Sequence, residues 1–138
     1  MREKHSDKKN AFSLLEAANR QMIFTLTLIP TDESSFNIIR NVYECFRMLG
    51  DAILVSQGKI SEDHIEPLKA LEGVKVKTDR PVKLVDSLRR MRHGINYYGY
   101  QPMKVEAEDA LSLANACFKP LWNAIHQIVE KSEQRRFL

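Results

Sequence analysis

Apolar side chains recur along this chain at alternating steps of three and four residues. That spacing keeps one stripe on one side of an α-helix, whereas a half-buried strand requires a period of two. The pattern predicts four long helices, at approximately residues 8–28, 36–58, 81–99 and 104–131. Residues 25–28 alternate like a strand, so the last turn of the first helix is ambiguous.

The segment between the second and third of these helices, residues 60–79, is the least regular part of the pattern. Ser61 is placed to cap a short helix that ends near Leu71, with Pro67 bending or dividing it. Residues 74–77 alternate polar and apolar, but the sequence offers no second strand for them to pair with. A loop is therefore predicted there.

Two residues inside the predicted helices need a particular explanation. Gly50 lies on the apolar seam of the second helix, where its lack of a side chain favours the close approach of another helix. Pro120 lies inside the last helix, where its missing N–H and its ring predict a kink or a local break.

Amphipathic helices joined by short links pack their apolar faces around one core. The sequence therefore predicts an all-α fold, namely an antiparallel up-down four-helix bundle with a short extra helix between its second and third helices. With 138 residues, the chain is expected to form one helical domain over residues 1–138. Its charged ends, residues 1–7 and 132–138, are expected to be flexible.

Composition and charge add few constraints on function. The hydrophobic fraction of 43% and the net charge of +3 are ordinary, and they permit a nucleic-acid partner without requiring one. Cys45 and Cys117 lie within apolar helical patterns and are expected to be buried, reduced thiols. No apolar run reaches the roughly 20 residues that span a bilayer, and the first residues lack the apolar core of a signal peptide. A cytoplasmic protein without a membrane partner is expected.

Several common catalytic and metal sites have no counterpart in the sequence. It contains no glycine-rich phosphate loop, no Gly-x-Ser-x-Gly elbow and no paired cysteines at zinc spacing. None of its four histidines follows a glutamate by three positions, the spacing of bundle di-iron sites. His64 is interpreted as part of a helix start, and His126 as a polar helix position. Neither a metal nor another cofactor is expected.

The densest group of polar and cationic side chains lies in the third long helix. It consists of Arg89, Arg90, Arg92, His93, Asn96 and Tyr97. At about 100° per residue, Arg89, Arg92 and Asn96 share one flank, and His93 lies just beyond them. Arg90 and Tyr97 lie further round. Such a flank can carry a phosphate or nucleic-acid site, although arginines on helices more often form a solvated face.

The stretch LRRMRHGINYYG, residues 88–99, resembles the HEPN family (higher eukaryotes and prokaryotes nucleotide-binding domains). The order of helices is similar over about residues 8–131. The resemblance implies a four-helix up-down bundle that commonly dimerises. Many members are metal-independent ribonucleases, often the toxin halves of toxin–antitoxin pairs encoded beside a small nucleotidyltransferase.

The family's catalytic signature is an Arg, usually followed by a polar residue, with a His after four to six intervening positions. Arg92 matches the signature Arg, His93 matches its polar follower, and Tyr97 stands where the His would be. The resemblance implies catalytic roles for these three residues. Arg92 would stabilise transition-state charge, His93 would exchange a proton, and Tyr97 would donate a hydrogen bond. Phosphate or nucleotide binding would involve Arg89, Arg90 and Asn96.

Three functions stay open at this point. The first is a homodimer that binds RNA or a nucleotide through the Arg92 cluster and cuts RNA without a metal. The second is a non-enzymatic partner of a small nucleotidyltransferase. The third is a helical interaction bundle whose arginines are merely solvated.

Overall fold

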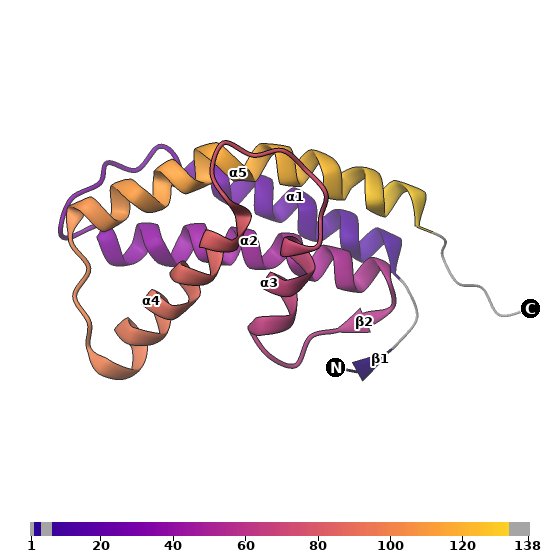
Figure 1. Ribbon diagram of the computed structural model, residues 1–138, viewed down its shortest axis with the longest axis horizontal. Helices are drawn as coiled ribbons and strands as arrows, with labels where there is room; N and C mark the ends of the chain where they lie inside the picture. Colours follow the sequence, from indigo (N-terminus) through magenta and orange to yellow (C-terminus); the bar gives the residue numbers. More distant parts are fainter. Residues whose placement is uncertain (1, 4–6, 133–138) are drawn as a thin grey trace, which may run out of the picture.

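A computed structural model of the chain describes residues 2–3 and 7–132 (Figure 1). Helices dominate this part of the chain: α1 (Lys8–Thr25), α2 (Ser35–Ser56), α3 (Ile65–Glu72), α4 (Val85–Tyr98) and α5 (Lys104–Lys131). A short 3-10 helix, η1 (Val82–Leu84), leads into α4. The all-α prediction is confirmed, and the four long helices lie where the apolar spacing placed them.

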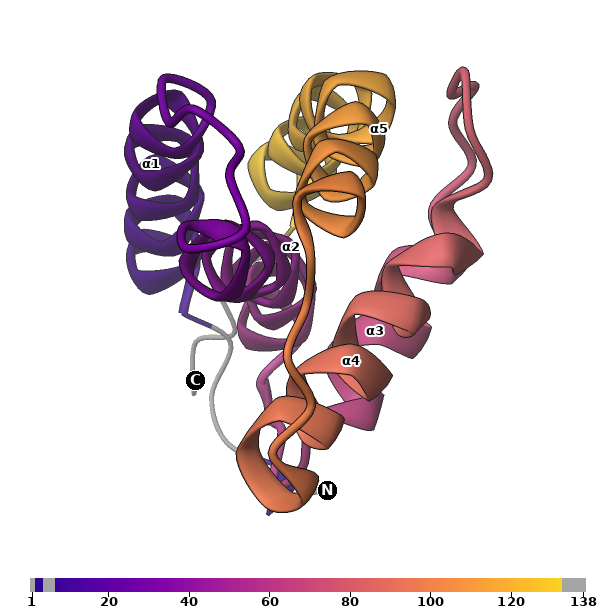
Figure 2. The same ribbon diagram turned by 90° about the vertical axis from the view of Figure 1, so that its left-hand side faces the viewer.

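Helix α2 lies at the centre of the fold and contacts every other helix. Figure 2 views α1, α2 and α5 nearly end-on, with α3 and α4 together on the opposite side of α2 from α1. The core is built where these helices meet, and there Phe46 of α2 packs edge-on against Phe118 of α5, with ring centroids 5.8 Å apart. Buried residues occur on most of the circumference of α2, and not only on the predicted seam. A helix with such a wide apolar face can pack against several neighbours at once, which explains its central position.

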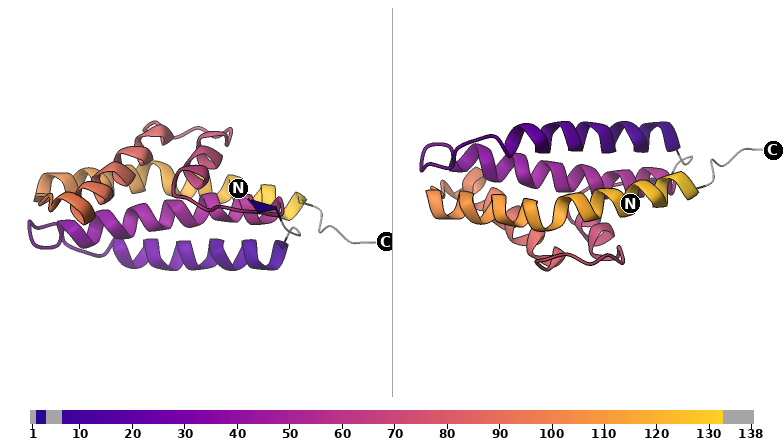
Figure 3. Two further views of the ribbon diagram at one scale, coloured as in Figure 1. Left: turned by 90° about the horizontal axis from the view of Figure 1, so that it is seen from below. Right: turned by 90° about the horizontal axis from the view of Figure 1, so that it is seen from above.

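Helix α4 packs less closely than the other long helices. In Figure 3 it crosses at an angle, whereas α1, α2 and α5 run side by side. Only Val85 and Leu88 of α4 are buried, and Tyr98 is 79% exposed. The predicted apolar stripe therefore buries its first half only, because the second half of α4 leans away from the core. The regular up-down arrangement of four helices stays a prediction.

The chain between α2 and α4 differs in detail from the prediction. The short helix α3 begins at Ile65, and Asp63 caps it, accepting hydrogen bonds from the backbone N–H groups of Ile65 (3.0 Å) and Glu66 (2.9 Å). The predicted cap at Ser61 is wrong. Pro67 falls in the first turn of α3, where no backbone N–H is needed, so it neither bends nor divides the helix. Residues 74–77 form a loop, as predicted.

Two short strands modify the expectation for the start of the chain. Arg2–Glu3 (β1) pairs antiparallel with Lys59–Ile60 (β2), which follows α2. These residues were expected to be flexible, but their backbone completes a small ladder. Asp7 then caps α1 by accepting a hydrogen bond from the N–H of Asn10 (2.9 Å). Residues 1, 4–6 and 133–138, also expected to be flexible, lie outside the described residues.

The structure answers two questions that the pattern left open, where α1 ends and how Pro120 affects α5. Helix α1 ends at Thr25, and the ambiguous residues 26–28 follow it as a hydrogen-bonded turn and not as a strand. Helix α5 continues without interruption through Pro120, so a local break there is wrong. Buried Phe118 and Leu121 on either side of Pro120 hold this part of α5 against the core.

Both cysteines are free and buried, as predicted. Burial raises the pKa of the Cys45 thiol to about 12, from an ordinary value near 9. Because the folded chain holds this proton more tightly than the unfolded chain, the free energy of unfolding is unaffected below about pH 9. It should fall as the pH rises from there toward 12, by about 1.4 kcal/mol per pH unit.

Denaturant unfolding measured between pH 8 and pH 11 tests this expectation. The Cys45→Ala variant should be less stable at pH 8 because it leaves a small cavity, but its stability should decline less steeply with pH. Equal pH slopes for the two proteins would show that Cys45 is not the group responsible.

Candidate functional site: the Arg92 cavity

Helix α4, helix α2 and the connection before α3 enclose a cavity of about 130 Å³. Its lining side chains are Tyr43, His64, Arg89, Arg92, His93 and Tyr97. We call this hollow the Arg92 cavity. Its volume is several times the roughly 30 Å³ that a water molecule occupies in the liquid, so a small anion fits. Two guanidinium groups, two imidazoles and two phenols thus surround one small space.

Helical spacing brings four of these side chains together. Arg89, His93 and Tyr97 follow one another at intervals of four along α4, and Arg92 lies beside them at i+3 from Arg89. Gly99 ends α4 in the left-handed conformation (φ 68°), which a glycine adopts without strain. Tyr100 then donates its backbone N–H to the carbonyl of Gly94 (3.2 Å), which closes the last turn.

Arg92 differs from its neighbours because its guanidinium is not engaged by a hydrogen bond. Its Nε atom lies 3.5 Å from Oε1 of Glu44, close enough for attraction between charges. The geometry is nevertheless not that of a hydrogen bond, and Nε is a buried donor without a partner among the described residues. The guanidinium also lies over the ring of Tyr43, 5.6 Å from its centroid. Arg92 is therefore positioned by its surroundings while its donors remain available.

The other arginines near the cavity are held by carboxylates. Arg89 and Arg90 both donate to Asp86, at 2.7 and 2.9 Å, and the hydrogen bond from Arg89 lowers the pKa of that carboxyl group. Arg47 of α2 donates to Glu44 and to Asp51, each at 2.7 Å. Glu44 is thus occupied mainly by Arg47, which leaves it only a longer contact to Arg92.

Tyr43 joins the cavity to the connection before α3. Its hydroxyl lies 3.1 Å from Nδ1 of His64, and its ring is fully buried. Burial, and to a smaller extent the neighbouring Glu44, raise the pKa of Tyr43 to about 12. The phenol therefore stays neutral at ordinary pH and fixes the orientation of the His64 ring.

His93 lies against tyrosine rings on its own helix. Its ring centroid is 4.6 Å from that of Tyr97 and 5.7 Å from that of Tyr98. These contacts limit the rotation of the imidazole next to the Arg92 cavity.

The structure places four of the six predicted site residues at the cavity: Arg89, Arg92, His93 and Tyr97. The two others lie elsewhere. Arg90 lines a separate hollow with Met91 and Tyr98, and Asn96 is exposed. The cavity follows the i, i+4 row of α4 that ends at Tyr97, and Asn96 lies on the neighbouring row.

The sequence analysis missed the contributions of Tyr43 and His64. Tyr43 lies on the apolar seam of α2, but its buried hydroxyl also needs a polar partner. His64 was interpreted as part of a helix start. No spacing rule relates residues on different elements, so their meeting with Arg92 became visible only in three dimensions.

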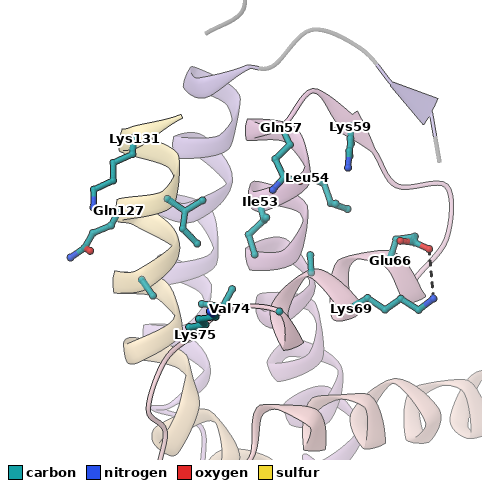
Figure 4. A pocket seen from close by; sticks show the side chains of 14 residues that line it. Ile53, Leu54, Gln57, Lys59, Glu66, Lys69, Val74, Lys75, Gln127 and Lys131 are labelled. Carbon is teal, nitrogen blue, oxygen red and sulfur yellow. Dashed lines mark ion pairs between the residues drawn. The ribbon is translucent and has the colours of Figure 1, made fainter. Parts of the chain in front are cut away.

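A second and larger hollow, of about 720 Å³, lies between the end of α2, helix α3 and helix α5 (Figure 4). Ile53, Leu54 and Val74 form part of its apolar lining. Several lysines surround it, namely Lys59, Lys69, Lys75 and Lys131. Lysines near the C-terminal ends of helices offset the partial negative charge there, which explains them without a ligand. Of the described residues that line it, none is a histidine or a cysteine.

Among residues 2–3 and 7–132, His, Cys, Asp and Glu side chains do not gather in a group that could hold a metal ion. None of the described helices combines the length and apolar character needed to cross a bilayer. Comparison with models of protein families, with curated proteins and with solved structures gave no significant match to this chain.

Proposed function

We propose that this chain is a HEPN-like protein that binds RNA in the Arg92 cavity and cuts it without a metal ion. The observation that carries the proposal is the state of Arg92. Its guanidinium lines a cavity of about 130 Å³ and has no hydrogen-bonded carboxylate in the described part of the chain. A guanidinium that is not hydrogen-bonded to a carboxylate can donate two parallel hydrogen bonds to a phosphate group.

The same cavity holds the groups that metal-independent cleavage needs. Cutting an RNA phosphodiester requires a base for the 2′-hydroxyl, an acid for the leaving oxygen and a cation for the charge of the transition state. Arg92 supplies the cation, and the imidazole of His93 can accept or donate a proton. Tyr97 donates a hydrogen bond to a phosphate oxygen.

We further propose that the protein acts as a homodimer with the four-helix up-down arrangement of the family. Exposed apolar side chains at one end of the molecule support a self-association surface, among them Ile29, Met103 and Val105. The connection before α2 and the start of α5 meet at this end, where the N–H of Lys104 donates to Asp32 (2.7 Å). The biological role would be that of a toxin-type ribonuclease.

One observation favours a second candidate function. Tyr97 occupies the position of the signature His, and a neutral phenol is a poor base at neutral pH. A chain that binds phosphate but does not cut would serve as a non-enzymatic partner of a small nucleotidyltransferase. The third alternative, arginines that are only solvated, does not account for the convergence of Arg89, Arg92 and His93 on one cavity.

Incubation of labelled single-stranded RNA with the purified protein in EDTA separates these functions. The proposal predicts cleavage, together with binding that weakens as salt increases. For single strands the slope of log affinity against log salt is about −0.7 per phosphate contact, so three contacts give about −2. Intact RNA with salt-sensitive binding would favour the non-enzymatic partner, and the absence of both would contradict the proposal.

A further inference from the structure

His64 reaches the Arg92 cavity from a different part of the chain than His93. It directly precedes α3, and its side chain lines the cavity opposite α4. The hydroxyl of Tyr43 holds Nδ1 at 3.1 Å, whereas Nε2 forms no hydrogen bond with the residues that the structure describes. His64 is itself exposed, so burial does not explain why its side chain is held at the cavity.

We propose that His64 is a catalytic residue of this site, the second proton-transfer group that works with His93 in cutting RNA. This inference rests on the proposed function, because it assigns a role within that reaction. It also compensates for the Tyr that stands at position 97. The second imidazole, absent from position 97 of α4, would be provided by the connection before α3, on the other side of the same cavity.

The reaction is an internal transfer at phosphorus. One imidazole accepts the proton of the 2′-hydroxyl as O2′ attacks the phosphorus atom, and the bond between phosphorus and O5′ breaks. The other imidazole donates its proton to O5′. The products are a 2′,3′-cyclic phosphate and a free 5′-hydroxyl, so no metal, oxidant or water is consumed in this step. Arg92 stabilises the added negative charge on the phosphate oxygens.

The contact with Tyr43 determines which nitrogen of His64 reacts. When Nδ1–H donates to the phenol oxygen, Nε2 is the nitrogen left to exchange a proton. The high pKa of Tyr43, about 12, means that the phenol does not ionise and exchange that proton itself. Tyr43 is thus a positioning residue, in the way that a hydrogen-bond partner orients the base in other proton-transfer sites.

The charges around each imidazole indicate which one is the acid. The hollow on the far side of His64 is lined by three carboxylates and one guanidinium: Asp51, Glu62, Asp63 and Arg47. His93 instead follows the two cations Arg89 and Arg92 on its own helix. A carboxylate can accept a hydrogen bond from the imidazolium that gives up a proton, whereas a guanidinium has no acceptor to offer it. We therefore assign His64 as the acid and His93 as the base.

Single-turnover cleavage of a short RNA in EDTA by the His64→Gln variant tests the assignment. The cleavage rate should fall about 10²-fold, while RNA affinity and the thermal unfolding midpoint remain those of the wild type. The matched control is His126→Gln, on α5 beside Trp122 and away from the cavity, which should cleave at the wild-type rate.

A substrate with sulfur in place of the leaving O5′ distinguishes an acid from a merely structural residue. A thiolate leaves without being protonated, so His64→Gln should cut this substrate nearly as fast as the wild type does. His93→Gln, which lacks the base, should remain slow on both substrates.

The possible outcomes are distinguishable. If His64→Gln cuts ordinary RNA at the wild-type rate, or stays slow on the sulfur substrate, His64 is not the acid, although the proposed function stands. If the wild-type protein binds RNA but never cuts it, the catalytic role of His64 is overturned and only the binding function remains. If it does not bind RNA, the proposed function fails first.

Discussion

Replacement of Arg92 by alanine should reduce RNA cleavage about 10³-fold and weaken RNA binding by about 10- to 100-fold. The larger effect on cleavage follows because phosphate charge increases in the transition state, where a preorganised cation contributes most. The effect on binding is that of losing hydrogen bonds to a charged group. Single-turnover rates and equilibrium titrations with the same RNA measure the two quantities separately.

Arg90→Ala is the matched control, because it removes the same charge from the same helix. Arg90 is 74% exposed and bonded to Asp86, and it lies outside the Arg92 cavity. Its loss should reduce affinity only slightly, through the general field of the protein, and leave the cleavage rate unchanged. Equal losses in the two variants would show that α4 offers a diffuse basic surface and not a specific phosphate site.

The Arg92→Ala variant should remain folded, which makes the comparison meaningful. Glu44 keeps its two hydrogen bonds from Arg47, so no carboxylate is left without a cation. The main structural loss is the contact between the guanidinium and the Tyr43 ring, worth about 1 kcal/mol. Circular dichroism during thermal unfolding checks this point.

The largest effect on stability is expected at Gly50. A Cβ atom placed there would lie 2.1 Å from the backbone carbonyl oxygen of Pro67, and 2.8 Å from its Cα. The backbones of α2 and α3 approach so closely that no side-chain rotation can make room. Gly50→Ala should therefore destabilise the protein by about 3 kcal/mol, near the upper end for overpacking, and denaturant unfolding measures that loss.

Gly73→Ala tests whether the Gly50 effect is steric. Gly73 follows α3, is exposed, and has ordinary helical geometry (φ −79°), and its nearest neighbour to an added Cβ is 3.5 Å away. Its replacement should leave stability unchanged or raise it by about 0.5 kcal/mol, because the unfolded chain loses freedom. A destabilisation of Gly50→Ala no larger than that of Gly73→Ala would contradict the close packing of α2 on α3.

The helices could be predicted because their burial is repetitive. In α1 the stripe is buried at Ala11, Leu15, Ala18 and Met22, but Leu26 and Ile29, where the same period continues past the end of the helix, are exposed. Gly50 allows the close helix approach that its position on the seam of α2 indicated. Helix α4 shows the limit of this reasoning. Its apolar period continues to Tyr98, yet no residue after Leu88 is buried. Periodicity predicts which side of a helix is apolar, but it does not predict how the helix is tilted relative to the core.

Only the part of the site that lies on α4 could be predicted from the sequence. Spacing along α4 brought Arg89 and Arg92 to one side, but it could not show that α2 and the connection before α3 form the opposite wall. The roles of Tyr43 and His64 depend on contacts between residues far apart in the sequence. A buried hydroxyl on an apolar seam was the one local signal, since such a group needs a polar partner.

The most direct measurement is a crystal structure of the protein with a short RNA whose 2′-hydroxyl at the cleavage position is replaced by hydrogen, so that it binds without being cut. Our account predicts a phosphate in the Arg92 cavity, within hydrogen-bond distance of the Arg92 guanidinium and beside the imidazoles of His64 and His93. A phosphate bound instead at the lysine-lined hollow of Figure 4, with the Arg92 cavity filled by solvent, would contradict it.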